Sequence, residues 1–297
     1  MSILKRVLYS LITIVVFVYL GIAVMALFSD RILFQPQRST YRDDRFPTLR
    51  GASQSSPKAS AVQVIKLHSQ TRGARPTTIT AIYLPNSGAT HTLLFSHGNA
   101  EDLGDDLPIL EMFRDAGFAA FAYDYRGYGT SEGRSSEPTI YSDADAAYEY
   151  LTRNLNVPPA RIIAFGRSLG SAAAIHTAAE SRPASSANRS ASDSPVAGLI
   201  VEAPFLSAFR VLTRVPLLPW DKFRNLSKIR RIHVPILVIH GRKDGIVPFW
   251  HGERIYRQAN PPKQHLWIDR AGHNDVLYIA GPQYLRAIRS FADSLPK

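Results

Sequence analysis

Three side chains that could share one hydrolytic reaction are spread over the second half of the chain. Ser168 is the centre of the pentapeptide GRSLG (166–170), which follows an apolar run and precedes a stretch of small residues. Glycines on both flanks permit a sharp turn between a strand and a helix, and such a turn exposes the serine hydroxyl. His273, in AGHND, and Asp244, in HGRKD, complete the chain order Ser–Asp–His. We predict Ser168 as nucleophile, His273 as general base and Asp244 as the acid that orients the base.

A second carboxylate is an alternative to Asp244 as the acid that orients His273. Glu202 ends a predicted strand, and an acid there could also reach a histidine across the cleft. We favour Asp244 because it follows the strand that directly precedes the His273 strand, so both loops lie at one edge of the sheet. Alanine replacement separates the two candidates, since only loss of the orienting acid should lower turnover by orders of magnitude.

An acyl-transfer site also needs backbone donors for the oxyanion of the tetrahedral intermediate. The N–H of Leu169, directly after the nucleophile, is one candidate. The loop after the third predicted strand, SHGNAE, should supply the other, from Asn99 or alternatively from Ala100. His97 in this loop is interpreted as a structural histidine. The spacing of the nine histidines fits no metal-binding motif, so we expect neither a metal nor another cofactor.

The elements that must position these residues alternate between short apolar runs and longer helical stretches. Strands are predicted at 61–68, 77–84, 92–96, 118–124, 161–166, 198–202, 235–240 and 264–269, and helices at 102–116, 139–154, 169–179, 249–258 and 282–295. This βαβα alternation predicts an α/β fold with a mostly parallel sheet covered by helices on both faces. The candidate residues follow strands, at the carboxyl edge where such sheets bind ligands.

A long apolar segment precedes this domain. Residues 8–28 carry no formal charge and would form a helix of roughly 31 Å, close to the thickness of a membrane hydrocarbon core. We predict an uncleaved single-pass anchor, with a cleaved signal peptide and a buried core helix as alternatives. Basic residues flank the segment on both sides, so the side of the membrane that holds the domain stays open. The predicted organisation is a short basic tail (1–7), the anchor (8–28), a linker (29–60) and a catalytic domain (61–297).

Composition and charge restrict the class of protein further. The chain has 297 residues, 45% of them hydrophobic, and no cysteine, which excludes disulfides, thiolate metal sites and a cysteine nucleophile. Its net charge of +11 is concentrated in residues 1–60 and 205–235, which carry +5 and +6. The remaining residues are neutral overall, so the charge favours a membrane surface as partner and argues against nucleic acid.

Six motifs resemble one known family. They are SHGNAED at 96–102, DYRGYG at 124–129, GRSLG at 166–170, EAPF at 202–205, HGRKD at 240–244 and GHN at 272–274. From about residue 60 onward the chain resembles an α/β-hydrolase-fold serine hydrolase, and within that fold the membrane-associated ABHD proteins, which include protein depalmitoylases, and fungal single-pass relatives. The resemblance implies an eight-stranded, mostly parallel sheet and the triad Ser168, Asp244 and His273. The depalmitoylases use a cysteine-rich, lipidated amino terminus, whereas this chain has an apolar span.

A lid is expected at 203–233, where hydrolases of this fold commonly carry an insertion. Apolar residues alternate there with basic ones, and we expect Leu212, Leu217, Trp220 and Phe223 to face an acyl chain. The basic residues, among them Lys228, would then face anionic headgroups. The alternative is a surface hairpin whose apolar side packs on the core.

The combined prediction is a membrane-anchored serine hydrolase of carboxylic esters or thioesters, acting on acyl substrates through an acyl-enzyme. Its expected partners are membrane lipid and the ester or thioester substrate. A serine peptidase of the same fold is the first alternative, because the fold does not specify the acyl group. A non-catalytic hydrolase-fold scaffold at the membrane is the second.

Overall fold

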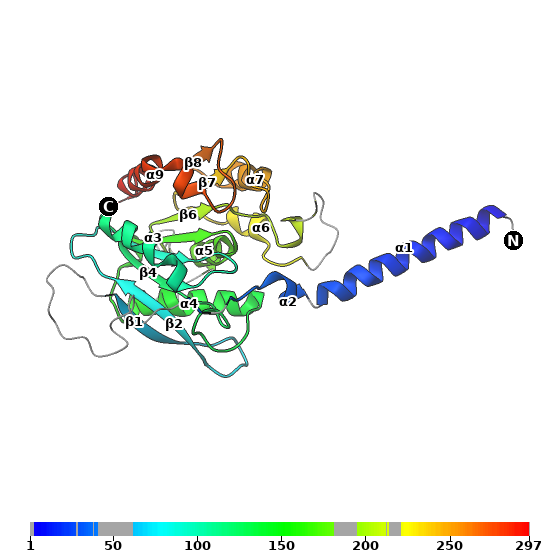
Figure 1. Cartoon of the computed structure of the whole chain (residues 1–297), viewed down its shortest axis with the longest axis horizontal. Helices are drawn as coiled ribbons and strands as arrows, with labels where there is room; N and C mark the ends of the chain where they lie inside the picture. The colour runs from blue at the N-terminus through cyan, green and yellow to red at the C-terminus, as the bar shows by residue number, and fades with distance from the viewer. Residues whose placement is uncertain are drawn as a thin grey trace.

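The computed structural model describes residues 3–27, 29–37, 39–40, 62–180, 195–211, 213 and 221–296. A long helix, α1 (Ile3–Leu27), projects from a domain that is built on one eight-stranded sheet (Figure 1). The apolar stretch Lys5–Val24 of α1 contains no buried residue, so the alternative of a buried core helix is wrong. Its length and composition are sufficient to cross a membrane.

The sheet has the strand order β1-β2-β4-β3-β5-β6-β7-β8. β1 and β2 pair antiparallel, as do β2 and β4, and all the other neighbours pair in parallel. The strands are β1 (Gln63–Ser69), β2 (Thr77–Leu84), β3 (Thr92–Ser96), β4 (Ala119–Tyr123), β5 (Ile162–Arg167), β6 (Gly198–Glu202), β7 (Ile236–Gly241) and β8 (Lys263–Ile268). The predicted α/β fold with a mostly parallel, eight-stranded sheet is therefore confirmed.

The central strands are apolar throughout because both of their faces are covered. All residues of β3, β4 and β6 are buried, and neighbouring side chains alternate between the two faces of the sheet. Leu94 thus joins the core cluster on one face, whereas Leu93 and Phe95 join the cluster on the other.

Helices cover each face. One core contains apolar side chains of α4 (Glu137–Arg153), α5 (Leu169–Glu180), α6 (Asn225–Ile229) and α7 (Trp250–Gln258). The other contains those of α3 (Leu103–Asp115), α8 (Val276–Ala280) and α9 (Pro282–Asp293). Two single 3₁₀ turns, η2 (Pro159–Arg161) and η3 (Phe209–Val211), lie between these elements.

The topology brings the candidate loops to one edge. β3 lies between β4 and β5, so the order of the strands reverses beside it. The loops that follow β3, β5, β7 and β8 leave from the carboxyl ends of parallel strands, where open α/β sheets bind their ligands.

The predicted linker at 29–60 needs correction at its beginning. Residues Ser29–Leu33 form a short helix, α2, and the side chains of Ser29 and Phe34 are buried. Phe34 packs edge-on against Phe223, with ring centroids 6.0 Å apart, and Asp30 forms an ion pair with Lys222. The segment directly after α1 therefore belongs to the folded domain. Residues 41–61 lie outside the described residues.

The structure describes part of the predicted lid. In that part the apolar side packs on the core, as in the alternative to a lid. Phe223, expected to face an acyl chain, is only 1% exposed and packs among Phe34, Tyr141 and Phe205. Lys228, expected to face headgroups, places its ammonium 3.5 Å from the centre of the Tyr141 ring. Leu212, Leu217 and Trp220 lie outside the described residues.

Candidate active site

The turn that carries Ser168 joins β5 to α5 and holds this residue at φ +51°, in the left-handed region that L-residues rarely adopt. A Cβ at Gly166 would lie 2.1 Å from the carbonyl oxygen of Gly170, and a Cβ at Gly170 would lie 1.9 Å from that of Ser96. Only glycine fits at either position, because the helix starts in direct contact with the neighbouring strands. This close packing forces the sharp turn that presents the hydroxyl.

His273 connects the serine to a carboxylate. Its Nε2 lies 2.9 Å from Ser168 Oγ, and its Nδ1 lies 2.7 Å from Asp244 Oδ2. Because an ionised carboxylate only accepts hydrogen bonds, Nδ1 carries the proton and Nε2 is free to accept from the serine hydroxyl. The structure thus brings together the three residues that the sequence selected from distant segments.

The Asp244 carboxylate is held in its ionised form. Its Oδ1 accepts hydrogen bonds from the backbone N–H groups of Ile246 and Val247, at 2.9 and 2.8 Å. Burial alone would raise the pKa of Asp244, but the hydrogen bonds from His240 and His273 outweigh burial and hold it well below its usual range. A permanently charged acid is suited to orient His273 and to stabilise its protonated form.

Glu202, the rival acid, has a different set of contacts. Its Oε2 accepts a hydrogen bond of 2.5 Å from the Tyr284 hydroxyl, and burial raises its pKa. Its backbone carbonyl accepts the N–H of Ser168 at 2.8 Å. Glu202 therefore supports the turn that carries the serine, and the carboxylate that bonds to His273 is that of Asp244.

The two proposed oxyanion donors lie at the starts of α5 and of the loop after β3. Within the part of the chain that the structure describes, neither the Leu169 N–H nor the Asn99 N–H donates a hydrogen bond. Ala100, the alternative donor, has φ +60°, so the loop turns sharply directly after Asn99. The oxyanion role of these amides stays a prediction.

The Asn99 side chain makes contacts that the sequence analysis missed. Its Nδ2 donates to the Leu33 carbonyl at 2.7 Å, and its Oδ1 accepts from the Gln35 N–H at 3.0 Å and from the Tyr128 hydroxyl at 2.5 Å. Thr40 N–H donates to Asp102 at the other end of the same loop, at 2.7 Å. The segment after the apolar helix thus braces the predicted oxyanion loop. The polar residues at 35–40 were the only available signal.

A buried charge network lies on the other side of this loop. Arg167, directly before the nucleophile, forms ion pairs with Glu101 and with Asp106, the latter at 3.3 Å. Burial and the neighbouring Glu101 raise the pKa of the Asp106 carboxyl well above its usual range. His97 is fully buried, as expected for a structural histidine, and its Nε2 lies 3.4 Å from Asp124. This network connects the loop after β3 to the nucleophile turn.

Comparison with known proteins gives one family. The model of the family described as serine aminopeptidase S33 matches residues 88–223. The alpha/beta hydrolase domain-containing protein aho-3 of Caenorhabditis elegans is 38% identical over 216 residues, which cover 71% of this chain and 59% of the relative. Alpha/beta hydrolase domain-containing protein 17B of Xenopus tropicalis is 34% identical over 226 residues, which cover 74% of this chain and 73% of the relative. The chain thus spans less than two thirds of the nematode relative.

Solved structures with the same architecture are more distant in sequence. The esterase Pf2001 of Pyrococcus furiosus superposes with a TM-score of 0.64 at 15% identity, covering 88% of this chain and 96% of the esterase. The acetyl xylan esterase of Paenibacillus sp. R4 superposes with a TM-score of 0.62 at 17% identity, covering 91% and 99%. These similarities establish the fold.

Proposed function

This chain belongs to the α/β-hydrolase family, and on that premise we propose that it is a membrane-anchored serine hydrolase that cleaves carboxylic ester or thioester bonds. The observation that carries the proposal is the unbroken series of contacts from Ser168 Oγ through His273 to Asp244. An ionised acid, an oriented imidazole and a serine in a strained turn are the parts that acyl transfer requires.

The reaction proceeds in two halves. His273 Nε2 takes the proton of Ser168 while Oγ attacks the carbonyl carbon, and the Leu169 and Asn99 amides stabilise the oxyanion. The tetrahedral intermediate collapses to an acyl-serine as His273 gives its proton to the departing alcohol or thiol. His273 then takes a proton from water as the water oxygen attacks the acyl carbon, and it gives that proton to Ser168 Oγ as the bond between Oγ and the acyl carbon breaks and the carboxylic acid leaves.

The names of similar structures and the apolar helix support the proposed substrate class. The two similar solved structures described above are named esterases, which supports ester chemistry. The exposed 20-residue apolar stretch of α1 supports attachment to a membrane, where acyl chains are abundant. We extend the proposal to lipid or acyl-protein substrates on this basis.

A fluorophosphonate probe tests the nucleophile. Such probes react with activated serines, so the full-length chain should be labelled and Ser168→Ala should not be. Hydrolysis of p-nitrophenyl esters should fall by several orders of magnitude in the same variant. A folded chain that is neither labelled nor active would support the non-catalytic scaffold instead.

A peptidase is the second candidate, because the matching family model is described as a serine aminopeptidase. Esters, thioesters and aminoacyl arylamides should be assayed in parallel, with acyl groups of increasing length. We expect the highest kcat/KM on the oxygen or sulfur esters. A preference for the arylamides would replace the esterase proposal by the peptidase.

A further inference from the structure

A second histidine lies against the carboxylate of the triad. His240, near the end of β7, is fully buried, and its Nε2 lies 3.2 Å from Asp244 Oδ2. This is the same carboxylate oxygen that lies 2.7 Å from His273 Nδ1. Oδ2 of Asp244 is thus flanked by two imidazole rings, and the reaction proposed above uses only one of them.

The contacts of His240 determine which of its ring nitrogens carries the proton. Nε2 also lies 2.9 Å from the carbonyl oxygen of Val247, and a carbonyl only accepts hydrogen bonds, so Nε2 is protonated. Nδ1 is buried and has no hydrogen-bond partner within the described part of the chain. A proton on Nδ1 would be buried without an acceptor, so the ring that fits these surroundings is neutral, with its one N–H at Nε2.

Val247 connects His240 to Asp244 a second time. The Val247 N–H donates to Asp244 Oδ1 at 2.8 Å, while the Val247 carbonyl accepts from His240 Nε2. The Ile246 N–H donates to the same Oδ1 at 2.9 Å. Backbone groups therefore fix one oxygen of the carboxylate, and His240 lies against the other, which is the oxygen that bonds to His273.

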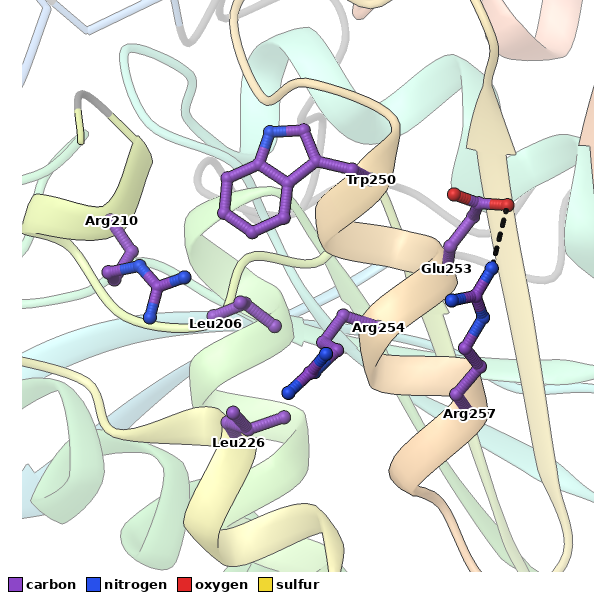
Figure 2. Close-up of a pocket in the computed structure, with 7 residues that line it drawn as sticks. All are labelled: Leu206, Arg210, Leu226, Trp250, Glu253, Arg254 and Arg257. Atoms are coloured by element: carbon purple, nitrogen blue, oxygen red, sulfur yellow. Dashed lines mark ion pairs between the residues drawn. The ribbon is translucent and has the colours of Figure 1, made fainter. Parts of the chain in front are cut away.

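Helix α7 holds the His240 ring in this orientation. A Cβ at Gly252 would lie only 2.3 Å from Nδ1, so the backbone of the helix packs directly on this edge of the ring. Phe249 contacts the ring edge-on, with centroids 5.7 Å apart. A groove on another side of α7 is lined by residues at helical spacing, Trp250, Glu253, Arg254 and Arg257 (Figure 2). Gly252 is buried and faces the sheet instead.

We propose that His240 is a positioning residue of the triad, whose Nε2–H holds the Asp244 carboxylate in line with His273 Nδ1. The proposal rests on the serine hydrolase function proposed above and adds a fourth side chain to its machinery. Asp244 acts when His273 becomes positively charged, and a carboxylate already held in place stabilises that charge without reorienting. His240 keeps its own proton throughout and acts only through Asp244.

Three substitutions at His240 test the proposal through the kinetics of ester hydrolysis. His240→Leu removes the N–H, His240→Gln carries an N–H donor as many bonds from the backbone as Nε2, and His240→Asn carries one at the place of Nδ1. We expect kcat to fall at least about tenfold in His240→Leu and His240→Asn, the effect of losing one hydrogen bond to a charged group, with KM changed less than about twofold. His240→Gln should recover most of the kcat.

A matched control separates this role from a general loss of stability. Leu237→Ala, at another buried position of β7, should lower the unfolding temperature and leave the kcat of the folded chain unchanged. An unchanged kcat in His240→Leu, or equal losses in His240→Leu and His240→Gln, would overturn the proposal. If His240→Leu does not fold, His240→Asn takes its place in the same comparison.

A second measurement does not depend on turnover. The proton between His273 Nδ1 and Asp244 Oδ2 lies in a short, charge-assisted hydrogen bond and should give a proton NMR resonance downfield of the backbone amides, absent in His273→Gln. We expect this resonance to shift or broaden in His240→Leu and to remain in His240→Gln. An unchanged resonance in His240→Leu would overturn the proposal. The expected pattern in a chain that hydrolyses no ester would count against the proposed function alone.

Discussion

At the scale of single residues, substitutions of the two buried carboxylates near Ser168, Asp244 and Glu202, should affect activity differently. Asp244→Asn keeps the size of the side chain but removes the charge that orients His273, so kcat should fall on the order of 10⁴-fold. Glu202→Gln keeps an oxygen that can accept the Tyr284 hydroxyl, so most of the activity should remain. Ester hydrolysis and thermal unfolding of both variants provide the comparison. Similar losses of activity in folded variants would contradict the assignment of Asp244.

The buried charge network should make stability depend on pH. Burial and Glu101 raise the pKa of Asp106, and although burial opposes it, Asp124 raises the pKa of His97 to about 8. Between about pH 6.5 and 8 the folded chain therefore keeps protons that the unfolded chain releases, and stability falls as pH rises. Each such proton contributes about 1.4 kcal/mol per pH unit.

Asp106→Asn removes one of these protons, so its unfolding free energy should fall less steeply over the same pH range. The window starts at about pH 6.5 because below it His251, whose pKa is lowered to about 4, acts in the opposite direction. Asp115→Asn, at an exposed position of the same helix, is the matched control and should keep the original slope. Denaturant unfolding at several pH values measures all three slopes, and parallel slopes would refute the role of Asp106.

At the scale of elements, the segment after α1 should act on catalysis through Asn99. Asn99→Ala removes the hydrogen bonds to Leu33 and Gln35 and leaves the predicted oxyanion loop unbraced. We expect a lower kcat with little change in KM, because only transition-state stabilisation is affected. Asn86→Ala, which removes a side-chain hydrogen bond to Arg114 in a distant loop, should keep kcat. Equal kcat values in the two variants would show that the brace has no catalytic effect.

Some of the helices and strands could be predicted from the sequence, and others could not. Strands β2, β3 and β6 have the predicted bounds because a short apolar run between turn residues specifies a buried strand well. The helices α2, α6 and α8 were missed, since five residues are too few to show helical periodicity.

The residues of the candidate site could also be predicted from the sequence only in part. Ser168, His273 and Asp244 could be selected because each follows a recognisable strand, and the topology of the sheet then brings the strand ends together. The contact between Asn99 and Gln35 joins residues 64 positions apart in the sequence, and no periodic pattern predicts it. Phe223 was misplaced because an apolar side chain in a basic segment fits a lid and a core equally well.

At the scale of the whole molecule, the segment that follows the apolar helix is joined to a distant segment of the chain. The two segments that hold the net charge, 1–60 and 205–235, meet where Phe34 contacts Phe223 and where Asp30 contacts Lys222. Parts of the two segments thus lie in contact just after the end of α1, although they are far apart in sequence. This arrangement attaches the domain to its proposed anchor by packed side chains.

Two truncations should separate anchoring from catalysis. Removal of residues 1–28 deletes the apolar helix but keeps Asp30, Leu33 and Phe34, so the chain should move from the membrane to the soluble fraction and still hydrolyse a water-soluble ester. Removal of residues 1–40 also deletes Leu33 and Gln35, which bond to Asn99, and Phe34, which packs on Phe223, so this chain should lose both membrane attachment and most of its kcat. Sedimentation after carbonate extraction and ester hydrolysis measure the two properties. Equal activity of the two truncated chains would mean that residues 29–40 are only a tether, whereas activity confined to the longer one would make them part of the catalytic framework.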